Sequence, residues 1–216
     1  MYRAIDIETE NTGSDIMADN KRILSVQIGD DTKQDLWWAD SKDPKWNLES
    51  AKKEIASLLA QGVVFVGYNL KGFDVPILKR FLGVEIPESN ILDLCECPKI
   101  PELTGKNKSR LEEVCSACGI DVTHKQRMKE KEKKFRSMEA HKKHATVKAK
   151  EILKEKPWWS SNFAYEYVLS KIAGGNAIYE AYQEFVENDG QKDSLFYEYA
   201  IGDIIVEYQL FKKLGY

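Results

Sequence analysis

The sequence predicts an α/β protein, and three observations favour this class. Short segments with strand patterns gather in the first 95 residues, and longer segments with helical spacing lie between and after them. The chain has 216 residues, which is the size of one domain. Its 43% hydrophobic and 31% charged residues are ordinary for a globular chain with its own core. We therefore expect a single domain over residues 1–216.

Five strands are predicted in the first half of the chain. The first alternates between a face with Ile5 and Ile7 and a face with Asp6 and Glu8, which is typical of a half-buried strand. The others are short apolar or alternating runs bounded by turn residues. The expected strands are residues 2–8, 22–29, 34–39, 63–66 and 91–94, with a turn at 29–31.

Three helices are expected between and after these strands. Apolar side chains recur at helical spacing in each, and Gly62, Gly83 and Gly119 follow their ends. Pro76 would stand in the first turn of the second helix, where proline is tolerated. The expected helices are residues 48–59, 73–81 and 109–117.

The character of the chain changes after residue 122. From His124 to Lys156 there are 13 Lys and Arg against 5 Glu, a net charge of +8, whereas the rest of the chain carries −11. This segment lacks a clear apolar face, and we expect one or two charged helices inserted at about 122–160. Helices are expected again at 163–186, with a weak point at Gly174-Gly175, and at 194–214.

The uneven charge has two interpretations. An acidic body with a basic arm suits a protein that grips phosphates with one part and metal ions with the other. The alternative is a solvated helix whose charges only keep the chain soluble. The three histidines, His124, His141 and His144, also fall in this segment, and we expect them to face solvent.

Nothing in the sequence predicts export or membrane insertion. No stretch approaches the ~20 apolar residues that a membrane span requires, and residues 1–6 contain no apolar signal region. Four cysteines in a chain of this length do not suggest a secreted disulfide scaffold. We therefore expect a soluble intracellular protein, cytoplasmic or nucleoid-associated, with no membrane partner.

Asp6 and Glu8 are the first candidate site residues. They lie two positions apart on one face of the first strand, so their side chains are ~7 Å apart along the strand. Buried acids this close repel each other and favour a cation between them. Carboxylate ligands suit Mg²⁺ or Mn²⁺ better than zinc. An Asp-x-Glu pair alone also occurs by chance, so it needs support from other residues.

Asn69 and Asp74 supply that support, because they lie in the connection after the strand 63–66, where ligands of α/β sheets gather. The alternative is that Asn69 is a turn residue and Asp74 a helix N-cap. Tyr199 and Asp203 lie one turn apart on the last helix, and Asp203 has isoleucines on both sides. A carboxylate there is costly unless a cation pairs with it. The alternative is that Tyr199 belongs to the core and Asp203 points outwards.

Together and in this order, these residues resemble the DEDD superfamily of 3′→5′ exonucleases. A tyrosine four places before the last aspartate is the feature that resembles the DEDDy subgroup. The residues around the second motif look most like those of proofreading exonuclease domains of family A and family B DNA polymerases. The resemblance covers residues 1–120 and about 163–216, but not the basic insert. The matching residues are Asp6 and Glu8 in the first motif, Asn69, Phe73 and Asp74 in the second, and Tyr199 and Asp203 in the third.

The resemblance implies an RNase H-like fold, a mixed sheet flanked by helices, and hydrolysis of terminal phosphodiester bonds with two Mg²⁺ or Mn²⁺ ions. Nucleoside 5′-monophosphates would be released from the 3′ end. By resemblance, Asp6 contacts both ions, Glu8 and Asp203 complete the first ion site, Asp74 acts on the second, Tyr199 orients the attacking water, and Asn69, Phe73 and Thr9 bind the substrate.

The expected substrate is single-stranded DNA or the 3′ end of duplex DNA. RNA stays open, because no motif reports a contact to a 2′-hydroxyl group. The rival enzyme is an RNase D-like exoribonuclease, and the rival from another class is a nucleic-acid-binding module without catalysis. A separate DNA polymerase, or a replication or repair factor, is a further partner that the sequence leaves open.

The basic insert and the cysteines carry two further predictions. Phe135, Trp158 and Trp159 could stack with the bases of a bound strand, or the two tryptophans could lock the insert onto the body. The spacing Cys-x-Cys and Cys-x-x-Cys predicts a structural Zn²⁺ site, whereas the alternative makes these cysteines small apolar core residues. The predicted zinc ligands are Cys95, Cys97, Cys115 and Cys118.

Overall fold

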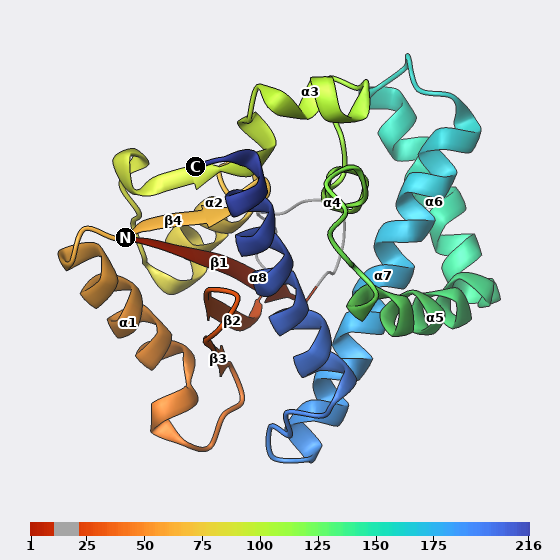
Figure 1. Cartoon of the computed structure of the whole chain (residues 1–216). Helices are drawn as coiled ribbons and strands as arrows, with labels where there is room; N and C mark the ends of the chain where they lie inside the picture. Colours follow the sequence, from red (N-terminus) through yellow and green to blue (C-terminus); the bar gives the residue numbers. More distant parts are fainter. Residues whose placement is uncertain (11–21) are drawn as a thin grey trace.

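The computed structural model describes residues 1–10 and 22–216 and has the expected α/β architecture (Figure 1). The described residues form a five-stranded sheet in the order β3-β2-β1-β4-β5. Strand β2 is antiparallel to both β1 and β3, whereas β4 runs parallel to β1 and β5 runs parallel to β4, so the sheet is mixed. The strands are β1 (Tyr2–Thr9), β2 (Ile23–Gly29), β3 (Gln34–Trp38), β4 (Val64–Gly67) and β5 (Ile91–Asp93).

The alternation along β1 separates a dry face of the sheet from the face that carries the acids. Ile5 and Ile7 are buried with residues of α1 (Leu48–Ala60) and α2 (Asp74–Ile77). Asp6 and Glu8 point to the opposite face, where α8 (Leu195–Leu214) crosses the sheet (Figure 1). The pleat of one strand therefore fixes which side of the molecule holds the candidate site.

The helices follow the expected order with three differences. The other helices are α3 (Lys99–Thr104), α4 (Leu111–Ala117), α5 (His124–Ser137), α6 (Glu139–Glu155) and α7 (Ser161–Glu187), and single 3₁₀ turns lie at Pro44–Trp46, Glu88–Asn90 and Leu94–Glu96. Helix α3 was not expected. The helix expected at 73–81 is divided into α2 and a π-helical turn, η2 (Leu78–Leu82), which ends at Gly83 with φ of +65°.

The third difference concerns α7, which continues through Gly174-Gly175 without the expected weak point. Small buried residues line this stretch of α7, and Met128 and Phe135 of α5 belong to the same apolar cluster. Because these two residues are seven positions apart, they lie on one side of α5 and give it the apolar face that its charges conceal.

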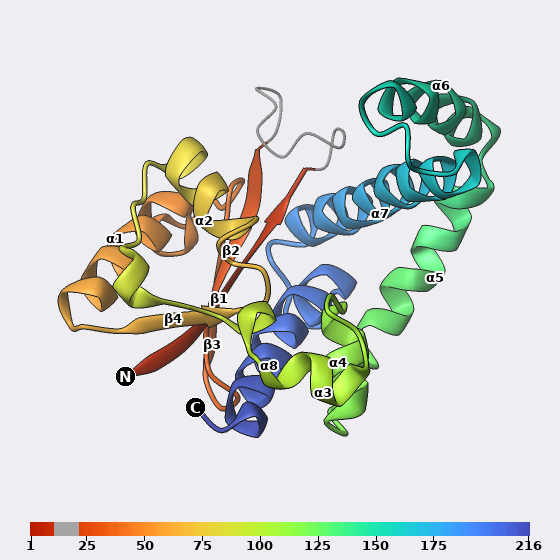
Figure 2. The ribbon, with the colours of Figure 1, turned by 90° about the horizontal axis from the view of Figure 1, so that it is seen from above.

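We call α5, α6 and the N-terminal half of α7 the helical arm. Helix α6 packs on α7 through Ala145 and Ala149, and it lies at the end of the arm farthest from the sheet (Figure 2). Much of the basic charge on α5 is paired with acids of α7: Lys131 lies 3.0 Å from Glu180 and 2.7 Å from Glu184. In the described part of the chain, no helix is long and apolar enough to cross a membrane.

Candidate metal centre

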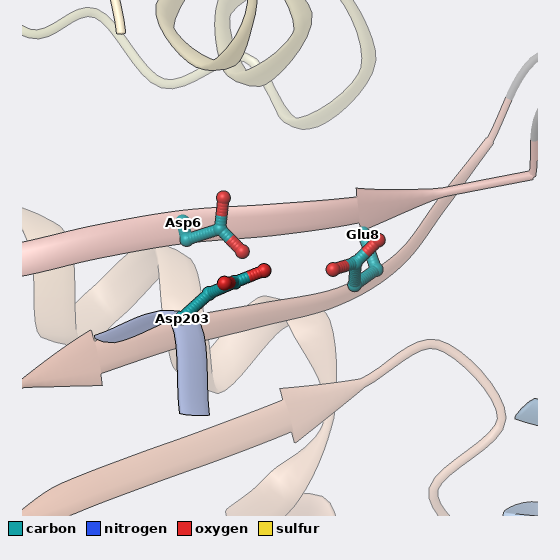
Figure 3. Close-up of side chains that lie close together, drawn as sticks. All are labelled: Asp6, Glu8 and Asp203. Carbon is teal, nitrogen blue, oxygen red and sulfur yellow. The ribbon is translucent and has the colours of Figure 1, made fainter. Parts of the chain in front are cut away.

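Three of the predicted acids come together between the sheet and α8. Asp6 and Glu8 project from β1 and Asp203 from α8, and their carboxylates point toward one another (Figure 3). One oxygen of each lies within 4.8 Å of the others, and no other described residues form such a group. The alternative that Asp203 points outwards is therefore wrong, because its side chain is buried against β1.

Asp74 lies beside this group and joins α2 to β1. Its Oδ1 accepts the backbone N–H of Ile7 at 3.1 Å, at the residue between Asp6 and Glu8. Asp74 is the first residue of α2 and makes no N-cap, so the N-cap alternative is also wrong. The buried carboxylate thus holds the second predicted motif against the first.

Glu207 is a fifth buried acid that the sequence analysis missed. It follows Asp203 by one helical turn, so it shares the same side of α8. Its Oε1 accepts the backbone N–H of Tyr68 at 2.9 Å, whereas its Oε2 has no hydrogen-bond partner among the described residues. The four-residue spacing in an apolar helix is the signal that could have identified it.

Two basic side chains from the start of α5 contact Asp203. Lys125 Nζ lies 2.8 Å from Asp203 Oδ1, and His124 Nε2 lies 3.0 Å from the same oxygen. The Lys125 side chain is only 13% exposed. The expectation that His124 faces solvent is therefore wrong, because the arm inserts its first turn into the site.

Gly202 makes this insertion possible. A Cβ at position 202 would lie under 3.0 Å from the ring and Cβ of His124, closer than side chains approach one another. The absence of a side chain at Gly202 therefore lets α5 pack directly against α8 beside Asp203.

The pKa shifts of these acids follow from the burial of several carboxyl groups close together. Burial, with the nearby Asp203, raises the pKa of Asp6 to about 8. Burial and the neighbouring acids also raise the pKa values of Glu8, Asp74 and Glu207 well above their usual range. Burial acts in the same direction on Asp203, but Lys125 and His124 outweigh it, so the pKa of Asp203 lies below its usual value.

Tyr199 lies next to this cluster, one turn before Asp203. Lys125 Nζ is 5.7 Å from the centre of its ring. Burial and the charges of Glu8 and Asp203 raise the pKa of Tyr199 well above its usual value. The Tyr199 hydroxyl therefore keeps its proton at neutral pH and can act as a hydrogen-bond donor.

The three residues predicted to bind substrate are near the acids in the sequence, but the contacts that the structure shows for them lie elsewhere in the fold. Asn69 has a positive φ of +69°, and its N–H donates to Asp93 Oδ1 at 2.7 Å. Phe73 packs partly against the core beneath α1, and Thr9 is buried at the end of β1. Asn69 is thus a turn residue, as the alternative proposed, and the roles of all three toward a substrate stay predictions.

The structure gives the zinc prediction no support. The four cysteines are free thiols, and their sulfurs do not join any group of three or more possible metal ligands among the described residues. Cys97 and Cys115 are buried in the apolar cluster between α4 and α8. Burial raises the pKa of the Cys115 thiol to about 12, which favours the protonated form over the thiolate that zinc requires.

The aromatic residues of the insert divide into two groups. Phe135 is 8% exposed and stacks on His141, so its prediction as a base-stacking surface is wrong. Trp159 packs against Phe163 and Tyr167, as the locking alternative requires. Trp158 alone points into solvent.

Comparison with known proteins adds no relative: a scan of protein-family models and a search of curated proteins both find no match.

Proposed function

We propose that this chain is a metal-dependent 3′→5′ exonuclease of the DEDDy type that acts on single-stranded DNA. One observation carries the proposal: Asp6, Glu8 and Asp203, which the motif pattern selects from opposite ends of the chain, have ligand oxygens within 4.8 Å of one another. The mixed sheet flanked by helices is compatible with the RNase H-like fold that the resemblance implies.

The residues of the cluster fit divalent metal ions. All the donors are carboxylates, which Mg²⁺ and Mn²⁺ prefer, and the buried Asp6 Oδ2 and Glu207 Oε2 lack partners among the described residues. Asp6, Glu8 and Asp203 would hold one ion, and Asp6 with Asp74 the second. When bound, such ions supply Lewis-acid chemistry that activates water and stabilises charge on the leaving 3′ oxygen.

The chain's own groups then orient the reactants. The protonated Tyr199 hydroxyl can hold the attacking water by a hydrogen bond, because its raised pKa makes it a poor base. Lys125 keeps Asp203 ionised and fixed in place. Asn69, Phe73 and Thr9 would bind the terminal nucleotide.

A cleavage assay tests this function. A 5′-labelled single-stranded DNA and an RNA of the same sequence are incubated with the protein in Mg²⁺, Mn²⁺ or EDTA. We expect the DNA to shorten stepwise from its 3′ end with either metal and to remain intact in EDTA. Asp6→Asn should lower the rate by about 10³-fold, whereas Asp35→Asn should not, because Asp35 lies on the edge strand β3 beside Lys33.

Two results would contradict the proposal. If neither strand is shortened while the protein still binds both, the chain is a binding module without catalysis. If RNA is degraded much faster than DNA, the reaction stands and the substrate assignment fails in favour of an RNase D-like enzyme.

A further inference from the structure

One side of α6 carries basic residues that the proposed active site does not use. Lys143, Lys150 and Lys154 fall within a narrow arc of this helix, because they are seven and four positions apart. They lie opposite Ala145, which packs against α7, and the buried Ala149, so the arc faces away from the body. Val147 lies on the same arc and is 57% exposed. We call these three lysines the α6 basic face.

The lysines of this face have no close ion-pair partner among the described residues, in contrast with those of α5, although Lys154 acts electrostatically on Glu151. All three lysines are exposed, and none makes an ion pair within 4.0 Å with another described residue. On α5, Lys131 and Arg136 are paired with acids of α7. The basic segment therefore uses part of its charge for packing and leaves the α6 basic face available to a partner.

An exposed indole lies at the C-terminal end of this face. Trp158 follows α6 directly and is 76% exposed, and the nearby Phe163 is 53% exposed. Trp159 holds the turn in place, with its ring 5.2 Å from that of Tyr167 and Lys156 Nζ 4.5 Å from its centre. Trp158 is thus presented on a fixed turn rather than used for packing.

Exposed cations in a row beside an exposed aromatic ring are the two elements of non-specific single-strand binding. The cations contact successive phosphates, and the ring stacks with a base. Lys143 and Lys154 are ~16 Å apart along the helix axis. Outside residues 124–156 the chain carries a net charge of −11, which repels a polyanion from the rest of the surface.

We propose that the α6 basic face and Trp158 bind single-stranded DNA upstream of the 3′ end that occupies the candidate metal centre. The helical arm connects the two places, because the first turn of α5 contacts Asp203. Helix α5 then leads away from the candidate metal centre to α6 (Figure 2). The direction of the bound strand rests on the proposed function. The binding itself rests on the three lysines of the α6 basic face and on Trp158.

Binding of a labelled single-stranded oligonucleotide, measured by fluorescence anisotropy in EDTA between 50 and 200 mM salt, tests the inference without cleavage. The variant Lys143→Gln/Lys150→Gln/Lys154→Gln should bind more weakly. Its plot of log affinity against log salt should be less steep by about 2, as expected for three lost phosphate contacts. Trp158→Ala should weaken binding about tenfold, and Trp158→Phe should restore most of the loss.

A matched control removes three exposed lysines elsewhere. Lys33→Gln/Lys53→Gln/Lys79→Gln changes the net charge equally but lies on the sheet edge, on α1 and on η2. It should leave affinity and salt slope close to those of the parent protein. Because every substituted side chain is at the surface, the melting temperature should confirm that all variants fold.

Two results would overturn the inference: an unchanged affinity and salt slope in the α6 triple variant, or equal losses in that variant and in its control. A vesicle-binding assay with phosphatidylserine gives a further such result. If the α6 triple variant loses vesicle binding but binds DNA like the parent protein, the inference is overturned and the face is assigned to an anionic membrane surface. A protein that binds as described but does not cleave would refute the proposed function alone. If the parent protein cleaves DNA and the α6 triple variant binds DNA as tightly as the parent, this inference alone is refuted.

Discussion

At the scale of single residues, Lys125 decides the charge state of the candidate metal centre. It is the buried ammonium nearest the acids, and it comes from the insert rather than from any of the three motifs. Its ion pair with Asp203 leaves Asp6 and Glu8 without a cationic contact of their own among the described residues. Lys125 thus pairs with one carboxylate of the cluster and leaves the other two open to metal ions.

Removing this charge should destabilise the metal-free protein. Lys125→Gln leaves the buried Asp203 without its ammonium partner, and such losses cost about 3 kcal/mol. The free energy of unfolding in EDTA, from urea denaturation, should fall by this amount, and Mn²⁺ should restore part of it. Lys125→Arg keeps the charge and should lose less. Equal stability of Lys125→Gln and the parent protein in EDTA would mean that the pair does not form.

At the scale of elements, the contact between α5 and α8 ties the helical arm to the site. Gly202 permits this contact, because any side chain there would collide with His124. The first turn of α5 can then place Lys125 against Asp203. The arm and the site are thus parts of one packed structure.

Two glycine substitutions separate packing from helix propensity. Gly202→Ala should lower the free energy of unfolding by about 1–3 kcal/mol, because the new methyl group collides with His124. Gly174→Ala, in open space on α7, should raise it by about 0.5–1 kcal/mol, because alanine is the better helix former. Thermal unfolding of both variants tests the pair, and a stabilised Gly202→Ala protein would contradict the α5–α8 contact.

The elements differ in how well the sequence predicts them. The strands and α8 carry their own local patterns, so their positions and the placement of Asp6, Glu8 and Asp203 could be predicted. The sequence also predicts helix in the α5 region, but not the apolar face of α5, because its apolar residues are two among many charges and become a face only against α7. Lys125 was missed for the same reason: its contact with Asp203 depends on tertiary packing between distant segments, which no local motif reports.

At the scale of the whole molecule, the buried acids link stability to pH and to metal ions. The pKa of Asp6 is about 8 in the folded chain, and those of Glu8, Asp74 and Glu207 are also raised. Between about pH 4 and 8 the folded chain therefore holds protons that the unfolded chain has released. Stability from these groups is complete at low pH and is lost as the pH rises toward 8.

In EDTA, the melting temperature should therefore fall by several degrees between pH 5.5 and pH 8.5. Mn²⁺ should reduce this fall, because it binds the deprotonated carboxylates of the folded chain. Asp6→Asn should also reduce it, since this variant has one less acid to ionise. Differential scanning fluorimetry measures all three, and a melting temperature in EDTA that rises with pH would contradict the assignment.

Metal binding between Asp6, Glu8 and Asp203 is tested most directly by a crystal grown or soaked with Mn²⁺ near pH 8, with anomalous diffraction collected above the manganese absorption edge. We expect an anomalous peak bounded by the carboxylates of Asp6, Glu8 and Asp203, and loss of that peak in Asp6→Asn. An anomalous map without a peak there, with Lys125 still paired to Asp203, would contradict a metal centre at this site and with it the proposed nuclease.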